Sequence, residues 1–237
     1  MLPGPDLIKK CPHCGKLAKQ RTIASGNNLG AQYWTDGWFF APMLPQTPQL
    51  VDCPNCKKTA WQSDFQEIDR SLSGPQASFL IRDAVDDELP LSQSAKEKLE
   101  KRERYKQLPY VEEAGSAGIA NFVESETMAV DREIAARIIL WRTWNNCRRS
   151  NPEEKPLNQD ELKNLNRLVK LMSETDDRRY LIRAELDRQL GKFADATTIL
   201  AMVLDTDRDV EVRNFIGKLL SDKDPYLRQI VFETTNR

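Results

Sequence analysis

The feature that most constrains this chain is a pair of CxxC motifs. The first reads Cys11-Pro12-His13-Cys14, the second reads Cys53-Pro54-Asn55-Cys56, and residues 15 to 52 separate them. A tetrahedral thiolate site needs four soft donors, and each CxxC turn supplies two sulfurs from one tight bend. The spacing therefore predicts one metal site, whose ligands are Cys11, Cys14, Cys53 and Cys56.

The residue types leave the identity of the metal open, because four thiolates accept either zinc or iron in tetrahedral geometry. We expect one structural zinc ion, with rubredoxin-type iron as the alternative, and closed four-cysteine zinc sites keep no open position for water. Gly15 follows the first motif and can take the left-handed conformation that lets backbone amides point at sulfur. Lys57 stands at the matching place after the second motif and departs from this pattern.

The first CxxC motif also matches the active site of a thiol oxidoreductase. A redox pair of that class needs a preceding strand, a following helix and a βαβ surround. Gly15 follows the second cysteine, no helix start is evident there, and a second CxxC motif lies further along the chain. These features favour the metal interpretation over the redox one.

The charge balance argues against a surface built mainly for an anionic partner. The chain has 35 Lys and Arg against 36 Asp and Glu, a net charge of -1, whereas nucleic acids and anionic membranes are held by clustered basic residues. The longest apolar runs, such as 199 to 204, are too short to cross a bilayer, and no signal peptide is evident. Because four of the five cysteines form paired metal-type turns, we expect a soluble cytoplasmic protein.

Residues 1 to 69 are predicted to form a small β-rich, zinc-ribbon-like module. Asp36-Gly37 lies between two aromatic segments, and this dipeptide favours a hairpin turn. The hairpin region carries more apolar side chains than a metal knuckle needs, and the candidate partner-binding residues are Tyr33, Trp34, Trp38, Phe39, Phe40, Met43 and Leu44. Two options stay open for them, namely docking on the chain's own helices near Trp141 and Trp144, or forming an exposed binding patch.

Residues 70 to 108 are predicted to be a charged, partly helical linker. Ser73-Gly74-Pro75 is a break, and Asp86-Asp87 begins an acidic turn. Residues 94 to 106 have helical character, and both signs of charge are mixed along them, which favours a solvated arm over a nucleic-acid-binding tail.

From residue 109 to 237 the hydrophobic residues recur at helical spacing. The pattern predicts helices over about 131 to 149, from Asn158 onward, over about 177 to 190, from Phe193 onward and around 212 to 220. Asn158 and Glu161 match a capping box, Gly191 a helix stop, and Asp224-Pro225 the start of a sixth helix. Short connections imply helical hairpins, so the predicted fold class is α+β, a zinc ribbon followed by a mainly helical domain.

The segment 183 to 207 resembles one tetratricopeptide repeat. The resemblance rests on Ala184, Gly191 before Phe193, Ala196 and Leu204, since small residues let two helices approach closely. The whole layout, through YWTDGWFFAPMLPQTPQLVDCPNC and WRTWNN, also resembles an uncharacterised bacterial family that joins an N-terminal double-CxxC module to a C-terminal TPR-like helical region. The resemblance implies this architecture and no particular activity.

The sequence offers few candidates for catalysis. His13 is the only histidine, so it would have to take part in any catalytic triad with a histidine base. Cys147 has no evident base beside it, and the acidic pairs lie at turns or helix starts, where carboxylates complement the helix dipole. No phosphate-binding glycine motif is present in the sequence. We therefore expect no enzymatic activity.

These observations favour a non-enzymatic, zinc-stabilised scaffold that binds a protein or peptide. The alternative is nucleic-acid binding by the ribbon, in which basic residues contact phosphates and aromatic rings stack on bases. The basic residues of that alternative are Lys9, Lys10, Lys16, Lys19 and Arg21. A thiol oxidoreductase or a rubredoxin-like electron carrier is less favoured.

Overall fold

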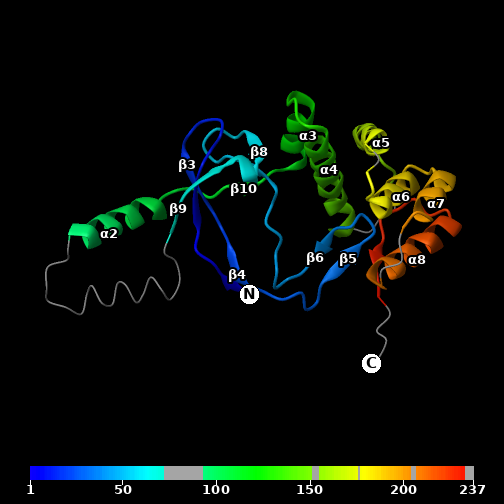
Figure 1. Ribbon diagram of the computed structural model, residues 1–237, viewed down its shortest axis with the longest axis horizontal. Coiled ribbons are helices and arrows are strands. Elements are labelled where there is room, and N and C mark those ends of the chain that lie inside the picture. Colours follow the sequence, from blue (N-terminus) through cyan, green and yellow to red (C-terminus); the bar gives the residue numbers. More distant parts are fainter. Residues whose placement is uncertain (72–92, 151–154, 176, 204–206, 233–237) are drawn as a thin grey trace. The chain divides into compact units, whose positions relative to one another are not determined.

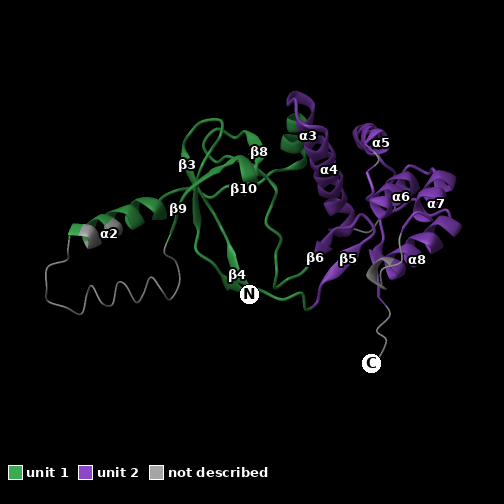
Figure 2. Cartoon of the chain, in the orientation of Figure 1, with its two compact units in different colours: residues 1–29, 41–122 green, residues 30–40, 123–237 purple. Residues whose placement is uncertain are grey.

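The computed structural model describes residues 1–71, 93–150, 155–175, 177–203 and 207–232. Short strands dominate the N-terminal part and helices the C-terminal part (Figure 1), which confirms the α+β fold class. The chain forms two compact units, residues 1–29 with 41–122 and residues 30–40 with 123–237 (Figure 2). Each unit has its own buried apolar cluster.

The first unit is built from short antiparallel strands. The strands are β1 (Leu2–Pro3), β2 (Leu7–Lys10), β3 (Leu17–Gln20), β4 (Ile23–Ser25), β7 (Leu50–Asp52), β8 (Thr59–Trp61), β9 (Gln66–Arg70) and β10 (Glu112–Glu113). They form small sheets with the strand orders β3-β2-β9, β10-β7-β8 and β1-β4. One CxxC motif lies in the turn between β2 and β3, and the other lies in the turn between β7 and β8. The unit thus uses the same local structure twice.

Helical segments complete the described part of the first unit. They are η1 (Gln62–Asp64), α2 (Gln93–Lys106) and the larger part of α3 (Ser116–Ser125). Helix α2 confirms the helical run expected for 94 to 106, and Lys101 on it pairs with Asp69 of β9 at 2.6 Å. Residues 72 to 92, on which the predicted breaks at 73–75 and 86–87 fall, lie outside the described residues.

A small sheet in the second unit contains the predicted hairpin. Strands β5 (Gln32–Trp34) and β6 (Phe39–Phe40) pair antiparallel, and Gly37 has a φ of 73° in their turn. The third strand is β11 (Gln229–Ile230), which pairs with β5. The prediction that a sixth helix begins at Asp224-Pro225 is therefore wrong. The Asp224 carboxylate accepts a hydrogen bond from the Tyr226 N–H at 2.8 Å, and this local turn leads into a strand.

Helices make up most of the rest of the second unit within the described residues. Besides the end of α3, they are α4 (Val130–Ser150), α5 (Gln159–Glu174), α6 (Tyr180–Gln189), α7 (Phe193–Leu200) and α8 (Asp207–Ser221). Asn158 and Glu161 form the predicted capping box of α5, and Gly191 follows α6 with a φ of 75°. Helices α4, α5 and α6 bury Ile134, Trp141 and Leu165 in one core. No helix in the described ranges has both the length and the apolar character that a bilayer crossing requires.

The two units divide the chain differently from the three segments predicted from the sequence. Residues 30–40 fall within the predicted metal module but belong to the helical unit, while residues 109–122 belong to the first unit. Strand β10 pairs with β7, and Lys19 bridges to Tyr110. Pairings between segments so far apart in sequence leave no trace in local composition.

Candidate metal centre

The four CxxC cysteines lie together in the first unit. Their Sγ atoms are all within 4.8 Å of one another, and none of these cysteines is in a disulfide. Two sulfur pairs that join the two motifs are 3.8 Å apart for Cys14 and Cys53 and 3.9 Å apart for Cys11 and Cys56. A tetrahedral zinc ion with Zn–S bonds of 2.3 Å places its sulfurs about 3.8 Å apart. The arrangement therefore fits a metal-binding tetrad.

The two CxxC turns share one backbone geometry. The Gly15 N–H donates to the Cys11 carbonyl at 3.0 Å, and the Lys57 N–H donates to the Cys53 carbonyl at 2.8 Å. Gly15 has a φ of 69° and Lys57 a φ of 58°, so both residues are left-handed. Lys57 thus differs from Gly15 in residue type but has the same left-handed backbone conformation. The lysine adopts the conformation that glycine takes in the first turn, at a conformational cost.

Backbone amides point at the sulfurs, as a thiolate site requires. Burial raises the pKa of Cys11 to about 12, despite hydrogen bonds from the amides of Cys14 and His13. Burial also raises the pKa of Cys53, but hydrogen bonds from the amides of Cys56 and Asn55 and from neighbouring thiols outweigh it and bring this pKa to about 7. Of these two thiols, Cys53 therefore has the lower pKa and Cys11 the higher.

The cluster lies against apolar side chains of the same unit. Val51, Ala60 and Phe65 are at most 3 % exposed and pack on the cysteines, and Val111 adds to this shell. His13 is exposed, and its backbone N–H lies 3.4 Å from the Cys11 sulfur. When bound, a metal would cross-link the two hairpin turns. Its four ligands would be Cys11, Cys14, Cys53 and Cys56.

The surroundings of the first CxxC motif differ from those of a thioredoxin-type redox pair. In that class the motif precedes a helix, and the helix N-terminus lowers the pKa of the reactive thiol. Here the chain turns at Gly15 and continues into strand β3, which runs antiparallel to β2. The motif therefore lacks the helix that a redox pair of this class uses.

The candidate partner-binding residues divide into packed and exposed ones. Trp34 is only 8 % exposed, whereas Phe40, Met43 and Leu44 are 44 %, 41 % and 36 % exposed. The half-buried members are Tyr33, Trp38 and Phe39. Tyr33 stacks on Phe39 with ring centroids 5.8 Å apart, and Trp38 stacks on Phe40 at 6.0 Å. Partner binding by this set stays a prediction.

A buried charge cluster joins the hairpin to α4, and the sequence reading missed it. Asp36 is fully buried, and its carboxylate pairs with Arg149 and accepts from the Asn145 amide at 3.0 Å. The Arg142 Nε donates to the Asp36 carbonyl at 3.0 Å. Burial lowers the pKa of Arg149, although Asp36 acts to raise it. The available signal was the recurrence of these polar residues at i, i+3 and i+7 on one helix face.

The five basic residues of the nucleic-acid alternative are not equally available. Lys9 and Lys19 are 8 % and 7 % exposed, and their ammonium groups donate to the carbonyls of Gln62 at 3.3 Å and Lys106 at 2.8 Å. Burial lowers the pKa of Lys9, although Glu67 acts to raise it. The remaining three, all exposed, are Lys10, Lys16 and Arg21.

Other candidate groups form no site in the described part of the chain. Cys147 is exposed, and its thiol donates to the Trp144 carbonyl at 2.8 Å. Apart from the cysteine tetrad, no group of three or more His, Cys, Asp or Glu residues is placed to hold a metal within those residues. Comparisons with protein-family models, curated proteins and solved structures found no match to this chain.

Proposed function

We propose that this protein is a non-enzymatic scaffold, in which a metal-stabilised β module and a helical region bind a protein or peptide partner. The observation that carries the proposal is the four-cysteine cluster. Its sulfur spacing suits a closed tetrahedral ion, and such sites hold a fold together without an open position for substrate. We expect the metal to be zinc, with iron as the alternative. We also expect the protein to be cytoplasmic, because cysteines stay reduced in that compartment.

The helical half supports the scaffold role. Helices α6 and α7 form a hairpin in which Ala184 and Ala196 are fully buried and Gly191 makes the turn. Small residues at a helix crossing and a glycine at the turn are the features for which we regard the region as TPR-like. Helical hairpins of that kind commonly present partner-binding surfaces.

The second candidate function is nucleic-acid binding, and the observations favour it less. Two of the five basic residues use their ammonium groups inside the first unit, so three exposed cations remain from that set. Three phosphate contacts give only weak binding, because the electrostatic part of the affinity grows with the number of contacts.

Affinity capture with the full chain tests the proposal. Zinc-loaded protein is incubated with extract of its source cells, with and without nuclease, beside a variant in which the exposed Phe40, Met43 and Leu44 are changed to Ser. Leu29→Ser, at a side chain that is 80 % exposed, is the matched control. We expect a protein partner that survives nuclease, binds the control and is lost with the triple variant. Capture of nucleic acid alone, abolished by nuclease, would overturn the proposal.

A further inference from the structure

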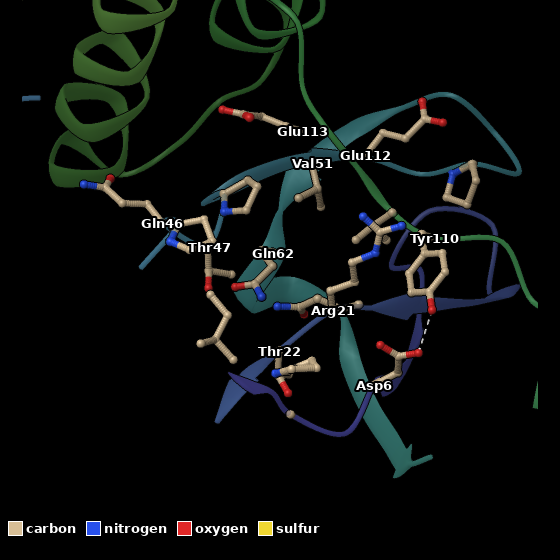
Figure 3. Close-up of a pocket in the computed structure, with 18 of the residues that line it drawn as sticks. Asp6, Arg21, Thr22, Gln46, Thr47, Val51, Gln62, Tyr110, Glu112 and Glu113 are labelled. Atoms are coloured by element: carbon tan, nitrogen blue, oxygen red, sulfur yellow. Dashed lines mark hydrogen bonds between the residues drawn. The ribbon is translucent and has the colours of Figure 1, made fainter. Parts of the chain in front are cut away.

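A large groove lies on the first unit, mainly on segments outside the two metal turns, although Pro54 of the second turn also lines it. Its volume is about 1010 Å³, and it is lined mainly by residues 20–23, 45–48 and 109–113 (Figure 3). Figure 3 shows Gln46 and Thr47 on one side and Tyr110 with Arg21 on the other. All of these residues belong to one compact unit, so the groove is a property of that unit alone.

One polar group in the wall of the groove has no partner. Gln20 is 6 % exposed, and its Oε1 is buried without a hydrogen bond from any residue that the structure describes. A buried amide oxygen left unpaired is costly, and native proteins satisfy most such atoms. The oxygen is covered, so a ligand N–H in the groove reaches it only if the Gln20 side chain changes its rotamer. The wall therefore holds an acceptor that a ligand can satisfy.

The side of the groove that carries Tyr110 is held in place before any ligand arrives. The Tyr110 hydroxyl donates to the Asp6 carboxylate at 2.7 Å, drawn as the dashed line in Figure 3. The Arg21 guanidinium lies 4.6 Å from the centre of the Tyr110 ring, and Lys19 lies 4.4 Å from it. A wall already ordered by these contacts loses little conformational entropy on binding.

The charges and the backbone of the lining suit an extended cationic ligand. Three of the described lining residues carry carboxylates, Asp6, Glu112 and Glu113, and Arg21 is the one basic side chain among them. Both glutamates are exposed and form β10, which is the edge strand of its sheet. Edge strands bind extended peptides through main-chain hydrogen bonds, and neighbouring pockets select their side chains.

We propose that this groove binds an extended peptide segment of a partner protein, with a Lys or Arg side chain facing Glu112 or Glu113, whose side chains point to opposite faces of β10. A backbone N–H of that segment satisfies the Gln20 oxygen. The inference deepens the proposed scaffold function and rests on it, because it names the surface and the chemistry of one partner site.

Fluorescence polarisation with the zinc-loaded full chain tests the groove directly. The probes are two labelled pools of about eight-residue peptides, a length that suits an extended strand. One pool has Lys at two fixed central positions and the other has Glu there, while the remaining positions are mixed Ser, Thr, Val and Pro. We expect the Lys pool to bind at least tenfold more tightly than the Glu pool, with an affinity that falls as salt rises.

Three variants locate the binding. Glu112→Lys with Glu113→Lys should abolish the preference for the Lys pool, whereas the double control Glu100→Lys with Glu126→Lys, at exposed sites outside the groove, should leave it unchanged. Thr47→Trp, at an exposed lining residue, should block both pools. Gln20→Leu should weaken binding at least fivefold while raising the midpoint of thermal unfolding, a combination that a merely structural role for Gln20 would not give.

The outcomes separate this inference from the proposed function. If binding of the Lys pool is unchanged by Glu112→Lys with Glu113→Lys and by Thr47→Trp, the groove proposal is overturned and the scaffold function still stands. If neither peptide pool binds but a partner is still captured from cell extract in the presence of nuclease, the groove proposal is likewise overturned and the scaffold function stands. Failure of both experiments overturns both proposals.

Discussion

Removing the carboxylate of Asp36 should weaken the attachment of the aromatic hairpin to α4. The side chain is fully buried and serves three donors at once, the Arg149 guanidinium, the Asn145 amide at 3.0 Å and the Trp38 N–H at 3.1 Å. Asp36→Ala leaves all three in place without their acceptor. The hydrogen bond from Arg142 to the Asp36 backbone carbonyl survives the change, so the hairpin keeps one polar contact with the helix.

The magnitude follows from the burial of both charges. The Arg149 side chain is 6 % exposed, so it becomes an uncompensated cation in a place that water barely reaches. Breaking a buried ion pair by deleting one partner costs about 3 to 5 kcal/mol. Arg149→Met should cost a similar amount, because it leaves the fully buried Asp36 carboxylate without its charged partner, even though the long apolar side chain can still pack on the Trp38 ring, from which the guanidinium now lies 4.3 Å. The variant that carries both changes should lose less free energy of unfolding than the two single variants lose together, by a coupling energy of about 2 kcal/mol.

Urea denaturation followed by tryptophan fluorescence, combined with hydrogen exchange, measures both effects. Trp34 and Trp38 lie in the hairpin and Trp141 and Trp144 lie in α4, so four of the five tryptophans report on this unit. Exchange should rise in residues 32 to 40 of the Asp36 variant. The control is Asp222→Ala, an exposed carboxylate whose loss should change stability by less than about 0.5 kcal/mol. A loss below about 1 kcal/mol for Asp36→Ala, with unchanged exchange in the hairpin, would refute the reasoning.

Three further predictions concern the metal turns and one ion-pair cluster. Cys14→Ser should abolish stoichiometric zinc in the purified protein and unfold the first unit, as a chelator should in the wild type, measured by metal analysis and circular dichroism. Lys57→Gly should stabilise the unit by about 0.5 to 1 kcal/mol, whereas Gly15→Ala should destabilise it by about 1 kcal/mol, because only glycine adopts a positive φ without cost. Hydrogen bonding from Arg167 lowers the pKa of Glu133 in the folded state. Its ion pair therefore adds stability that is complete above the unfolded pKa of about 4.3 and is lost as the pH falls through the folded value, so Glu133→Gln should flatten the acid limb of the stability curve.

Sequence reasoning worked where the deciding interactions are local. The capping box of α5 needs only Asn158 and Glu161, three residues apart, and the hairpin turn needs only Asp36 and Gly37. The cysteine cluster is the one distant pairing that the sequence indicated. Four cysteines in two CxxC turns usually bind one shared metal ion. The residue types alone therefore predict that the two turns lie close together in space.

Distant backbone pairings were beyond the sequence. The short strand β11 pairs with β5 across almost the whole chain, with Ile230 opposite Tyr33, and two residues carry no periodic pattern. The buried pair of Glu185 and Arg188 was equally hidden, because both lie on a helix where charged residues are normally solvated. Arg188 donates to the carbonyls of Asp224 and Tyr226 and so positions the segment that leads into β11.

The aromatic hairpin shows why periodicity alone could not settle its role. Alternation along a strand predicts two faces, but it does not say what covers either of them. The polar residues Asp36, Arg142 and Arg149 settle part of the question, because an ion pair buried between the hairpin and α4 fixes one face inside the second unit. Trp34 is buried on that face, whereas Phe40 is exposed. A partner can therefore reach only the exposed part of the hairpin, and a binding surface that needed Trp34 as well would first have to break the Asp36 pair.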